Sequence, residues 1–128
     1  MKLLLDTHIW IWFLQDPGRL APSVRRELAD QANELWISPI SVWEALNLRR
    51  KGRIATSGDF TTWLERSTPG IFQAPLTHQI VVATEHLNLH SDPADRFLAA
   101  TAQVLDLTLV TADTRLLGLG TIRTLGNR

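Results

Sequence analysis

The chain has 128 residues, of which 45% are hydrophobic, and this length and composition predict one packed globular domain spanning residues 1–128. Thirteen basic residues balance thirteen acidic ones, which excludes attraction to nucleic acid through overall charge and leaves it to a local patch. Cysteine is absent, so disulfides, thiolate zinc sites and cysteine nucleophiles are excluded.

The apolar start of the chain, MKLLLDTHIWIWFL, is only superficially similar to a secretory signal. Asp6 and His8 interrupt it, and no small-residue cleavage site follows, so we expect no signal peptide. No stretch approaches the roughly 18 uninterrupted apolar residues of a membrane span. We therefore expect a cytoplasmic protein with no membrane partner, which agrees with the lack of cysteine.

Short apolar runs alternate along the chain with amphipathic stretches that begin at a capping residue or a proline. In chain order we expect a strand at 2–6, helices at 8–14 and 22–34, a strand at 35–38, helices at 39–51 and 60–67, a strand at 71–74, helices at 78–87 and 93–105, a strand at 108–111 and an edge strand at 121–125. Thr7, Asp59 and Thr77 are the expected caps of three of these helices. This alternation predicts an α/β fold with a parallel sheet of four or five strands, covered by helices on both faces.

Two aspartates stand at the ends of expected strands. Asp6 ends the first strand, in LLLDT, and Asp113 lies just past the fourth, in LVTAD. Ligands of open parallel sheets bind in the crevice beyond the carboxyl ends of the strands, so both carboxylates should project into that crevice. For each residue taken alone, a cap of the next helix is the favoured explanation.

Glu44 lies inside a helix, in ISVWEAL, beyond the reach of a capping role. Helical spacing aligns it with Ile40 and Leu48 on a largely apolar face. Lys and Arg are absent from this helix before Arg49, so no ion-pair partner lies one turn away. We favour a Glu44 side chain that points inward.

The stretch HSDPADRFLAATA contains two aspartates, three residues apart. Asp92 is the better helix cap, since Pro93 suits the first helical turn. Asp95 aligns with Leu98 and Ala99 on the apolar stripe, so it should face the sheet beside the crevice.

Several carboxylates in one crevice repel each other, by about 4 kcal/mol for two charges 4 Å apart at an effective dielectric of 20. They would raise each other's pKa values or bind a cation. Hard oxygen ligands without His or Cys suit Mg²⁺ or Mn²⁺. Such an ion can activate a water for phosphodiester hydrolysis without a covalent intermediate.

With these four acids in this order, the chain resembles a PIN-domain ribonuclease and, more narrowly, the VapC toxins of bacterial toxin–antitoxin pairs. The matching stretches run from the first strand nearly to the end of the chain: LLLDTHIWIWFL, SPISVWEALNLRRKGRI, HSDPADRFLAATA and LVTADTRL. The order, spacing and local structure of the acids together form a specific signal.

The resemblance implies a three-layer α/β/α sandwich and a Mg²⁺- or Mn²⁺-dependent endoribonuclease that acts as a toxin. It also implies a homodimer and a cognate VapB-like antitoxin that covers the site. The acids that it assigns to catalysis and metal binding are Asp6, Glu44, Asp95 and Asp113. Thr111 occupies the position of a hydroxyl residue often seen near that site, and Thr7 and Asp92 are further auxiliary candidates.

Residues outside the acid set have more than one reading. The basic run RRKGR, with Arg49, Arg50, Lys51 and Arg53, could hold RNA phosphates or complement the dipole at a helix C-terminus. The tryptophans Trp10, Trp12 and Trp43 could fill the core or form a partner surface, whereas base stacking is less expected. Core packing is the default for Trp36. The four histidines are scattered and are interpreted as structural or surface residues: His8, His78, His86 and His90.

Three other functions remain as alternatives. A haloacid-dehalogenase-like phosphatase needs a second Asp two residues after the first, but position 8 is His. A non-catalytic α/β module that binds a protein through its tryptophan-rich first helix would use the acids only as caps. A DNA-directed nuclease of the same fold would differ in substrate alone.

Overall fold

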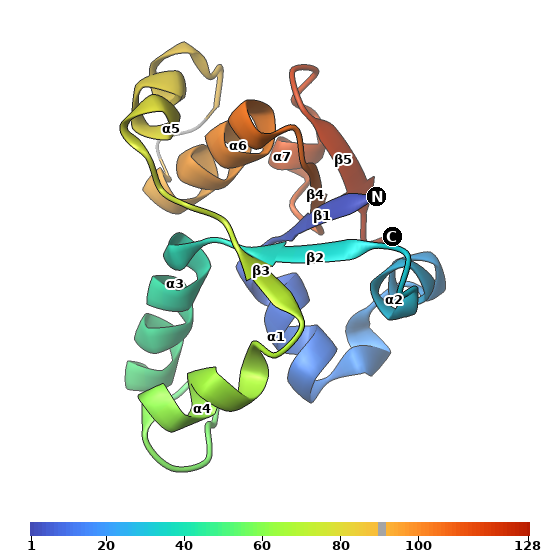
Figure 1. Ribbon diagram of the computed structural model, residues 1–128, viewed down its shortest axis with the longest axis vertical. Helices are drawn as coiled ribbons and strands as arrows, with labels where there is room; N and C mark the ends of the chain where they lie inside the picture. Colours follow the sequence, from blue (N-terminus) through green and yellow to red (C-terminus); the bar gives the residue numbers. More distant parts are fainter. Residues whose placement is uncertain (90–91) are drawn as a thin grey trace.

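A computed structural model describes residues 1–89 and 92–128 and shows a five-stranded, wholly parallel sheet (Figure 1). The strands lie in the order β3-β2-β1-β4-β5. Their bounds are Lys2–Leu5 for β1, Glu34–Ile37 for β2, Ile71–Gln73 for β3, Thr108–Thr111 for β4 and Arg123–Gly126 for β5. The chain builds outward from β1 in one direction through β2 and β3, and then in the other through β4 and β5.

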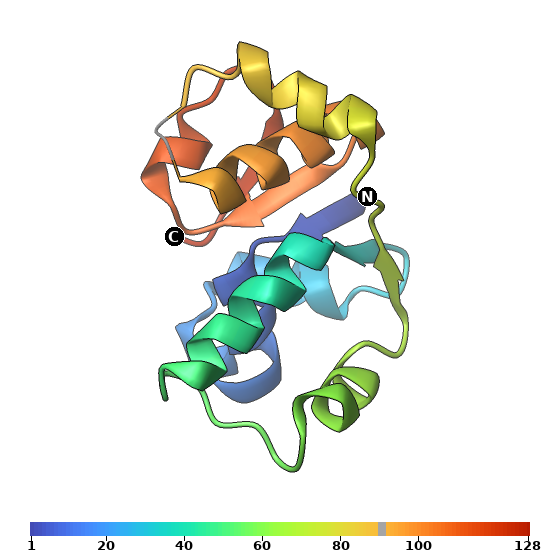
Figure 2. The same ribbon diagram turned by 90° about the vertical axis from the view of Figure 1, so that its left-hand side faces the viewer.

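Helices cover both faces of the sheet, so the expected three-layer α/β/α sandwich is confirmed. The first layer holds α1 (Thr7–Gln15), α2 (Pro22–Ala29), α3 (Pro39–Arg50) and α4 (Phe60–Ser67). The second holds α5 (His78–Ala83), α6 (Pro93–Leu105) and α7 (Thr114–Leu117). Two 3₁₀ turns, η1 (Pro17–Arg19) and η2 (Thr84–His86), complete the described elements. Figure 2 shows α3 on one side of the sheet and α6 on the other.

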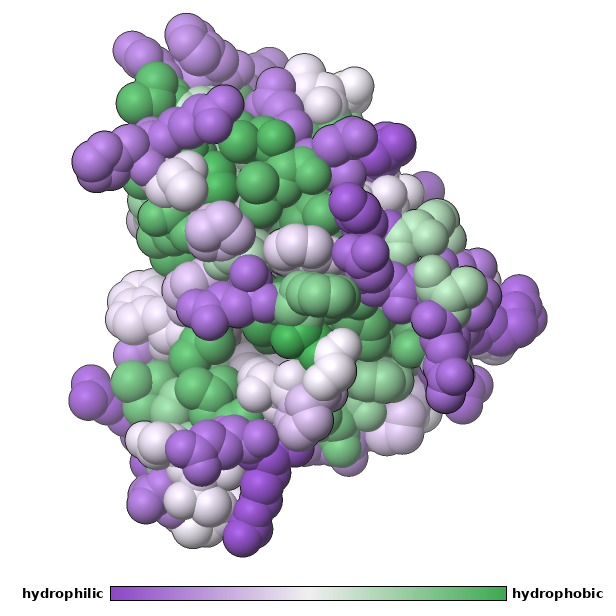
Figure 3. All heavy atoms as spheres, in the orientation of Figure 1, coloured by the Kyte–Doolittle hydropathy of each residue, from purple (hydrophilic) through white to green (hydrophobic). Residues whose placement is uncertain are grey.

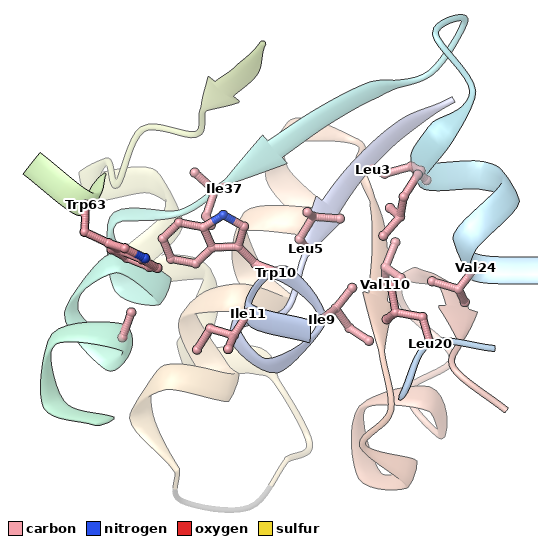
Figure 4. Close-up of a cluster of buried hydrophobic side chains, with 12 residues drawn as sticks. Leu3, Leu5, Ile9, Trp10, Ile11, Leu20, Val24, Ile37, Trp63 and Val110 are labelled. Carbon is pink, nitrogen blue, oxygen red and sulfur yellow. The ribbon is translucent and has the colours of Figure 1, made fainter. Parts of the chain in front are cut away.

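Alternation along the central strand divides the core into two parts. Leu3 and Leu5 of β1 pack with the α1–α4 layer, and Leu4 packs with the α5–α7 layer. In the first part, shown in Figure 4, the fully buried Trp10 of α1 meets Trp63 of α4 with ring centroids 5.3 Å apart. The second part rests on the apolar stripe of α6. The central strands β1 and β4 are thus buried on both faces, as their apolar sequences predicted.

The expected strands are confirmed, with ends that shift by one or two residues. Three helical expectations were wrong in detail. The helix expected at 22–34 ends at Ala29, because the next residues form a turn in which the Asp30 carboxylate accepts a hydrogen bond from Ala32 N at 2.9 Å. The helix expected at 78–87 ends at Ala83 and continues as η2. Asp6, and not Thr7, caps α1.

Two further observations concern the surface. No helix in the described ranges is long and apolar enough to cross a membrane. On the face seen in Figure 3, hydrophobic side chains gather in the upper half and near the centre, and hydrophilic side chains border both areas. Exposed apolar side chains on α5 include Val81 and Val82, which are 44% and 62% exposed.

Candidate active site

The carboxyl ends of β1 and β4 meet in the middle of the sheet, at the point where the strand order reverses direction. Asp6 N donates to Val110 O at 3.0 Å, which ties the end of β1 to β4. Such a reversal opens a crevice between the loops that follow the two strands. Asp6 follows β1 and Asp113 lies two residues beyond β4, so the fold places both aspartates at this crevice.

Both oxygens of the Asp6 carboxylate are held by neighbouring groups. Oδ1 accepts a hydrogen bond from Thr7 N at 2.7 Å and so caps α1, while Oδ2 accepts from the Thr111 hydroxyl at 2.6 Å. Burial raises the pKa of Asp6 above its ordinary value, although both hydrogen bonds and the nearby His8 oppose that rise. Asp6 is therefore both a cap and a rigidly oriented carboxylate at the crevice.

Glu44 points from α3 toward the same crevice. The Thr7 hydroxyl donates a hydrogen bond to its carboxylate and lies 2.9 Å from the Ser41 hydroxyl. The pKa of Glu44 is raised to about 6, chiefly by burial and also by the charges of Asp6 and Asp95, against the lowering effect of the hydrogen bond from Thr7. The inward orientation expected for Glu44 is confirmed.

The first turn of α6 contributes two aspartates with different surroundings. Asp92 is exposed and caps the helix, accepting a hydrogen bond from Ala94 N at 3.0 Å. Asp95 is only 9% exposed and lies on the same stripe as the buried Leu98 and Ala99. The expected division is confirmed: Asp92 starts the helix, and Asp95 turns toward the sheet.

Asp113 caps the short helix α7. Its carboxylate accepts from Arg115 N at 2.8 Å and pairs with the Arg115 guanidinium at 3.0 Å. The Arg115 side chain is 59% exposed, so solvent screens this pair and its contribution to stability is small. Asp113 thus serves as a cap in addition to lying at the crevice.

All five acids line one open cavity of about 580 Å³. It is lined by Asp6, His8, Trp12, Glu44, Asp92, Asp95, Ala112, Asp113, Thr114 and Arg115. Convergence of the predicted acids is therefore observed. Within the described ranges, however, no three His, Asp or Glu side chains already have the geometry of a finished metal centre.

Sequence reasoning missed two cationic or ionisable residues of this cavity. His8 is exposed, as expected of a surface residue, but it lines the cavity and stands 5.8 Å from Trp12 between ring centroids. Arg115 was not singled out at all. Each stands two residues after an acid of the set, and that proximity to Asp6 and Asp113 was the available signal.

The basic run after α3 separates into different roles. The Arg49 guanidinium donates to Thr56 Oγ1 at 2.8 Å and to Gly58 O at 3.3 Å, so it holds the loop that follows the helix. Arg50 and Arg53 are exposed. Lys51 lines a smaller groove of about 190 Å³ that shares His8 and Glu44 with the acid cavity. The run is thus not one uniform patch.

The tryptophans and the other histidines also separate. Trp10 is buried in the core, and Trp36 is half-buried and stacks on Phe72 with centroids 5.0 Å apart. Trp12 lines the acid cavity, and Trp43 is 57% exposed. His78 and His86 are exposed. His90 lies outside the described residues, as does Ser91 in the same motif.

Comparison with known proteins identifies the family of this chain. The PIN domain family model matches residues 3–120. Ribonuclease VapC22 of Mycobacterium tuberculosis is 30% identical over 116 residues, which cover 89% of this chain and 88% of that protein.

Solved structures agree on the fold. VapBC2 from Rickettsia felis, bound to a promoter DNA fragment, matches with a TM-score of 0.74 at 17% identity, over 98% of both chains. DNA-bound VapBC from Salmonella typhimurium matches with a TM-score of 0.72 at 18% identity, over 100% of this chain and 99% of that one. The family model over residues 3–120 and the 30% identity to ribonuclease VapC22 show that the chain belongs to the PIN domain family, and within it to the VapC group.

Proposed function

We propose that this protein is a metal-dependent endoribonuclease that acts as the toxin of a toxin–antitoxin pair. The observation that carries the proposal is the convergence of five carboxylates on one cavity, where burial and mutual repulsion raise the pKa of Glu44 to about 6. Asp6, Asp92 and Asp113 also cap helices, but capping does not require the side chains to meet. A site that keeps repelling charges together is suited to a cation.

The donor set fits Mg²⁺ or Mn²⁺. It consists of carboxylate oxygens, the hard ligands that these ions prefer, and among the described residues His8 is the one imidazole that lines the cavity. Asp6, Glu44, Asp95 and Asp113 are the residues that would hold the metal. When bound, the ion would lower the pKa of a coordinated water and neutralise charge on a phosphate.

The surrounding residues orient these acids. Thr111 and Thr7 N fix the Asp6 carboxylate, and the Thr7 hydroxyl fixes Glu44. Because these partners donate to the ionised carboxylates, they favour the charged forms that bind metal. Thr7 and Thr111 are thus proposed as positioning residues. Asp92, exposed at the rim, is an auxiliary acid.

RNA is the proposed substrate and a VapB-like antitoxin the proposed partner. The name of the VapC22 relative describes a ribonuclease, and the structural neighbours are VapBC pairs. A homodimer and a cytoplasmic location are part of the same proposal. DNA is the competing substrate for a nuclease of this fold and is included in the test.

The test compares cleavage of a total small-RNA pool by the wild type and by Asp95→Asn, with Mg²⁺, with Mn²⁺ and with EDTA. Asn is nearly isosteric with Asp but carries no charge. A matched control is Asp106→Asn, at the exposed opposite end of α6. Single-stranded DNA of mixed sequence forms a parallel arm, and each protein is also melted thermally.

We expect metal-dependent RNA cleavage by the wild type and by Asp106→Asn, and none by Asp95→Asn, with melting temperatures within a few degrees. Cleavage of DNA alone would replace RNA as the substrate. If no protein cuts either polymer and metal leaves all melting temperatures unchanged, the acids have structural roles only, and a protein-binding module is the better account.

A further inference from the structure

The second groove, next to the acid cavity, lies along the exposed face of α3. It is lined by His8, Trp43, Glu44, Asn47, Leu48 and Lys51. Trp43, Asn47 and Lys51 follow each other at intervals of four residues, so their side chains form one row along the helix. From Trp43 to Lys51 this row extends roughly 12 Å along the helix axis.

Trp43 differs from the other tryptophans. Trp10 and Trp63 pack against each other in the core, and Trp36 stacks on Phe72. Trp12 lies under the Arg19 guanidinium, 4.5 Å from its ring centroid. In the part of the chain that the structure describes, no aromatic or cation–π contact involves Trp43, which is 57% exposed. Its indole ring is therefore open to a ligand.

Lys51 provides the groove with a positive charge at the end far from the acids. It is exposed, whereas the neighbouring Arg49 is committed to Thr56 and Gly58. The groove thus combines an open aromatic ring, an amide and a cation. This combination is typical of surfaces that bind single-stranded nucleic acid through stacking and phosphate contacts.

The groove is continuous with the acid cavity, since His8 and Glu44 line both. A polynucleotide with one phosphate at the acids can continue over α3 without leaving the surface. We propose that this groove binds the single-stranded RNA substrate beside the cleavage point, with a base stacked on Trp43 and a phosphate at Lys51. This inference rests on the proposed function, because it assigns the same site a path for its substrate.

The test measures binding and does not depend on cleavage. A fluorescein-labelled single-stranded RNA oligonucleotide of mixed sequence is titrated with protein in EDTA, and its anisotropy is followed at several salt concentrations. The variants are Trp43→Ala, Trp43→Phe and Lys51→Gln. Arg50→Gln is the matched control, since Arg50 is exposed, carries the same charge and adjoins Lys51, but does not line the groove.

We expect Trp43→Ala to weaken binding by about 5- to 100-fold, the range measured for loss of one stacked base, and Trp43→Phe to keep most of the affinity. Lys51→Gln should reduce the slope of log K against log salt by about 0.7, which corresponds to one phosphate contact. Arg50→Gln should change affinity and slope less. Thermal melts identify any variant that fails to fold. If Trp43→Ala does not fold, tryptophan fluorescence decides instead: unlabelled RNA should quench the wild type more than Trp43→Phe, which lacks the stacked indole.

Three results would overturn the inference: no RNA binding by the wild type at high micromolar protein, equal binding by Trp43→Ala and the wild type, or equal effects of Lys51→Gln and Arg50→Gln. If Trp43→Ala bound RNA like the wild type but lost binding to a protein partner, the groove would be assigned to that partner. Groove-dependent RNA binding by a wild type that cuts no RNA would uphold the groove and refute the nuclease.

Discussion

Glu44→Gln is expected to make the protein more stable near neutral pH while abolishing its proposed activity. The pKa of Glu44 rises from 4.5 to about 6 in the folded protein, chiefly through burial. The folded state therefore holds this proton more tightly than the unfolded chain. The stabilisation from the protonated form is complete below pH 4.5 and is lost as the pH rises through about 6.

The magnitude follows from the same pKa difference. The interval between 4.5 and about 6, at about 1.4 kcal/mol per pH unit, gives about 2 kcal/mol. Glu44 is partly exposed to the cavity, so solvent screening reduces this to about 1 kcal/mol. Gln keeps the size of the side chain and an acceptor for the Thr7 hydroxyl, but carries no charge to desolvate.

The assay is chemical denaturation of the wild type and Glu44→Gln in EDTA, from pH 4 to pH 8. The two proteins should be equally stable near pH 4, and the variant should be more stable by about 1 kcal/mol at pH 7.5, or roughly 3–5 °C in Tm. Glu65→Gln, at an exposed position of α4, is the control and should follow the wild type. The reasoning would be refuted if the difference in unfolding free energy between the wild type and Glu44→Gln did not change with pH. It would also be refuted if the variant were less stable than the wild type at pH 7.5.

The other predictions concern three side chains around the site and the core. Thr111→Val removes the 2.6 Å hydrogen bond that lowers the pKa of Asp6, so the acidic limb of the pH–kcat/KM profile should move to higher pH; an unchanged limb would contradict this positioning role. Arg49→Ala removes the bonds to Thr56 and the following loop, so hydrogen exchange over residues 51–59 should accelerate, while unaltered exchange would mean that the loop holds itself. Trp10→Phe should destabilise the protein by about 1–3 kcal/mol through lost packing in a buried site, measured by urea denaturation. Trp10 Nε1 has no hydrogen-bond partner in the described residues, so a larger loss would reveal a polar contact.

The sequence by itself determined the class of fold and the identity of the acids. Strand periodicity is a local property. The apolar runs of β1 and β4 therefore predict burial on both faces before the neighbouring strands are known. The position of Asp95 on the stripe of Leu98 and Ala99 follows from helical spacing alone, and the structure confirms it. The order and spacing of the acids then identified the family.

Only the tertiary structure decided which residues meet. Hydrogen-bond partners and strand neighbours depend on contacts between residues that are far apart in the sequence, and local residue spacing does not encode these contacts. The strand order places β4 beside β1, and this brings Thr111 to Asp6 across 105 positions of the chain.

The same reason explains the misassigned cap. Thr7 and Asp6 are both good caps by residue type, and sequence reasoning chose Thr7. In the fold Asp6 caps α1, and the Thr7 hydroxyl instead reaches Glu44 on α3. Arg49 likewise donates a hydrogen bond to Thr56 in the loop after α3, and no local sequence pattern predicts that this loop folds back onto the helix. Lys51, two residues later, instead lines the smaller groove. Residue types and periodicity were enough to predict which residues lie at the site. The packing of α1 and α3 against the sheet determined which of these residues contact each other.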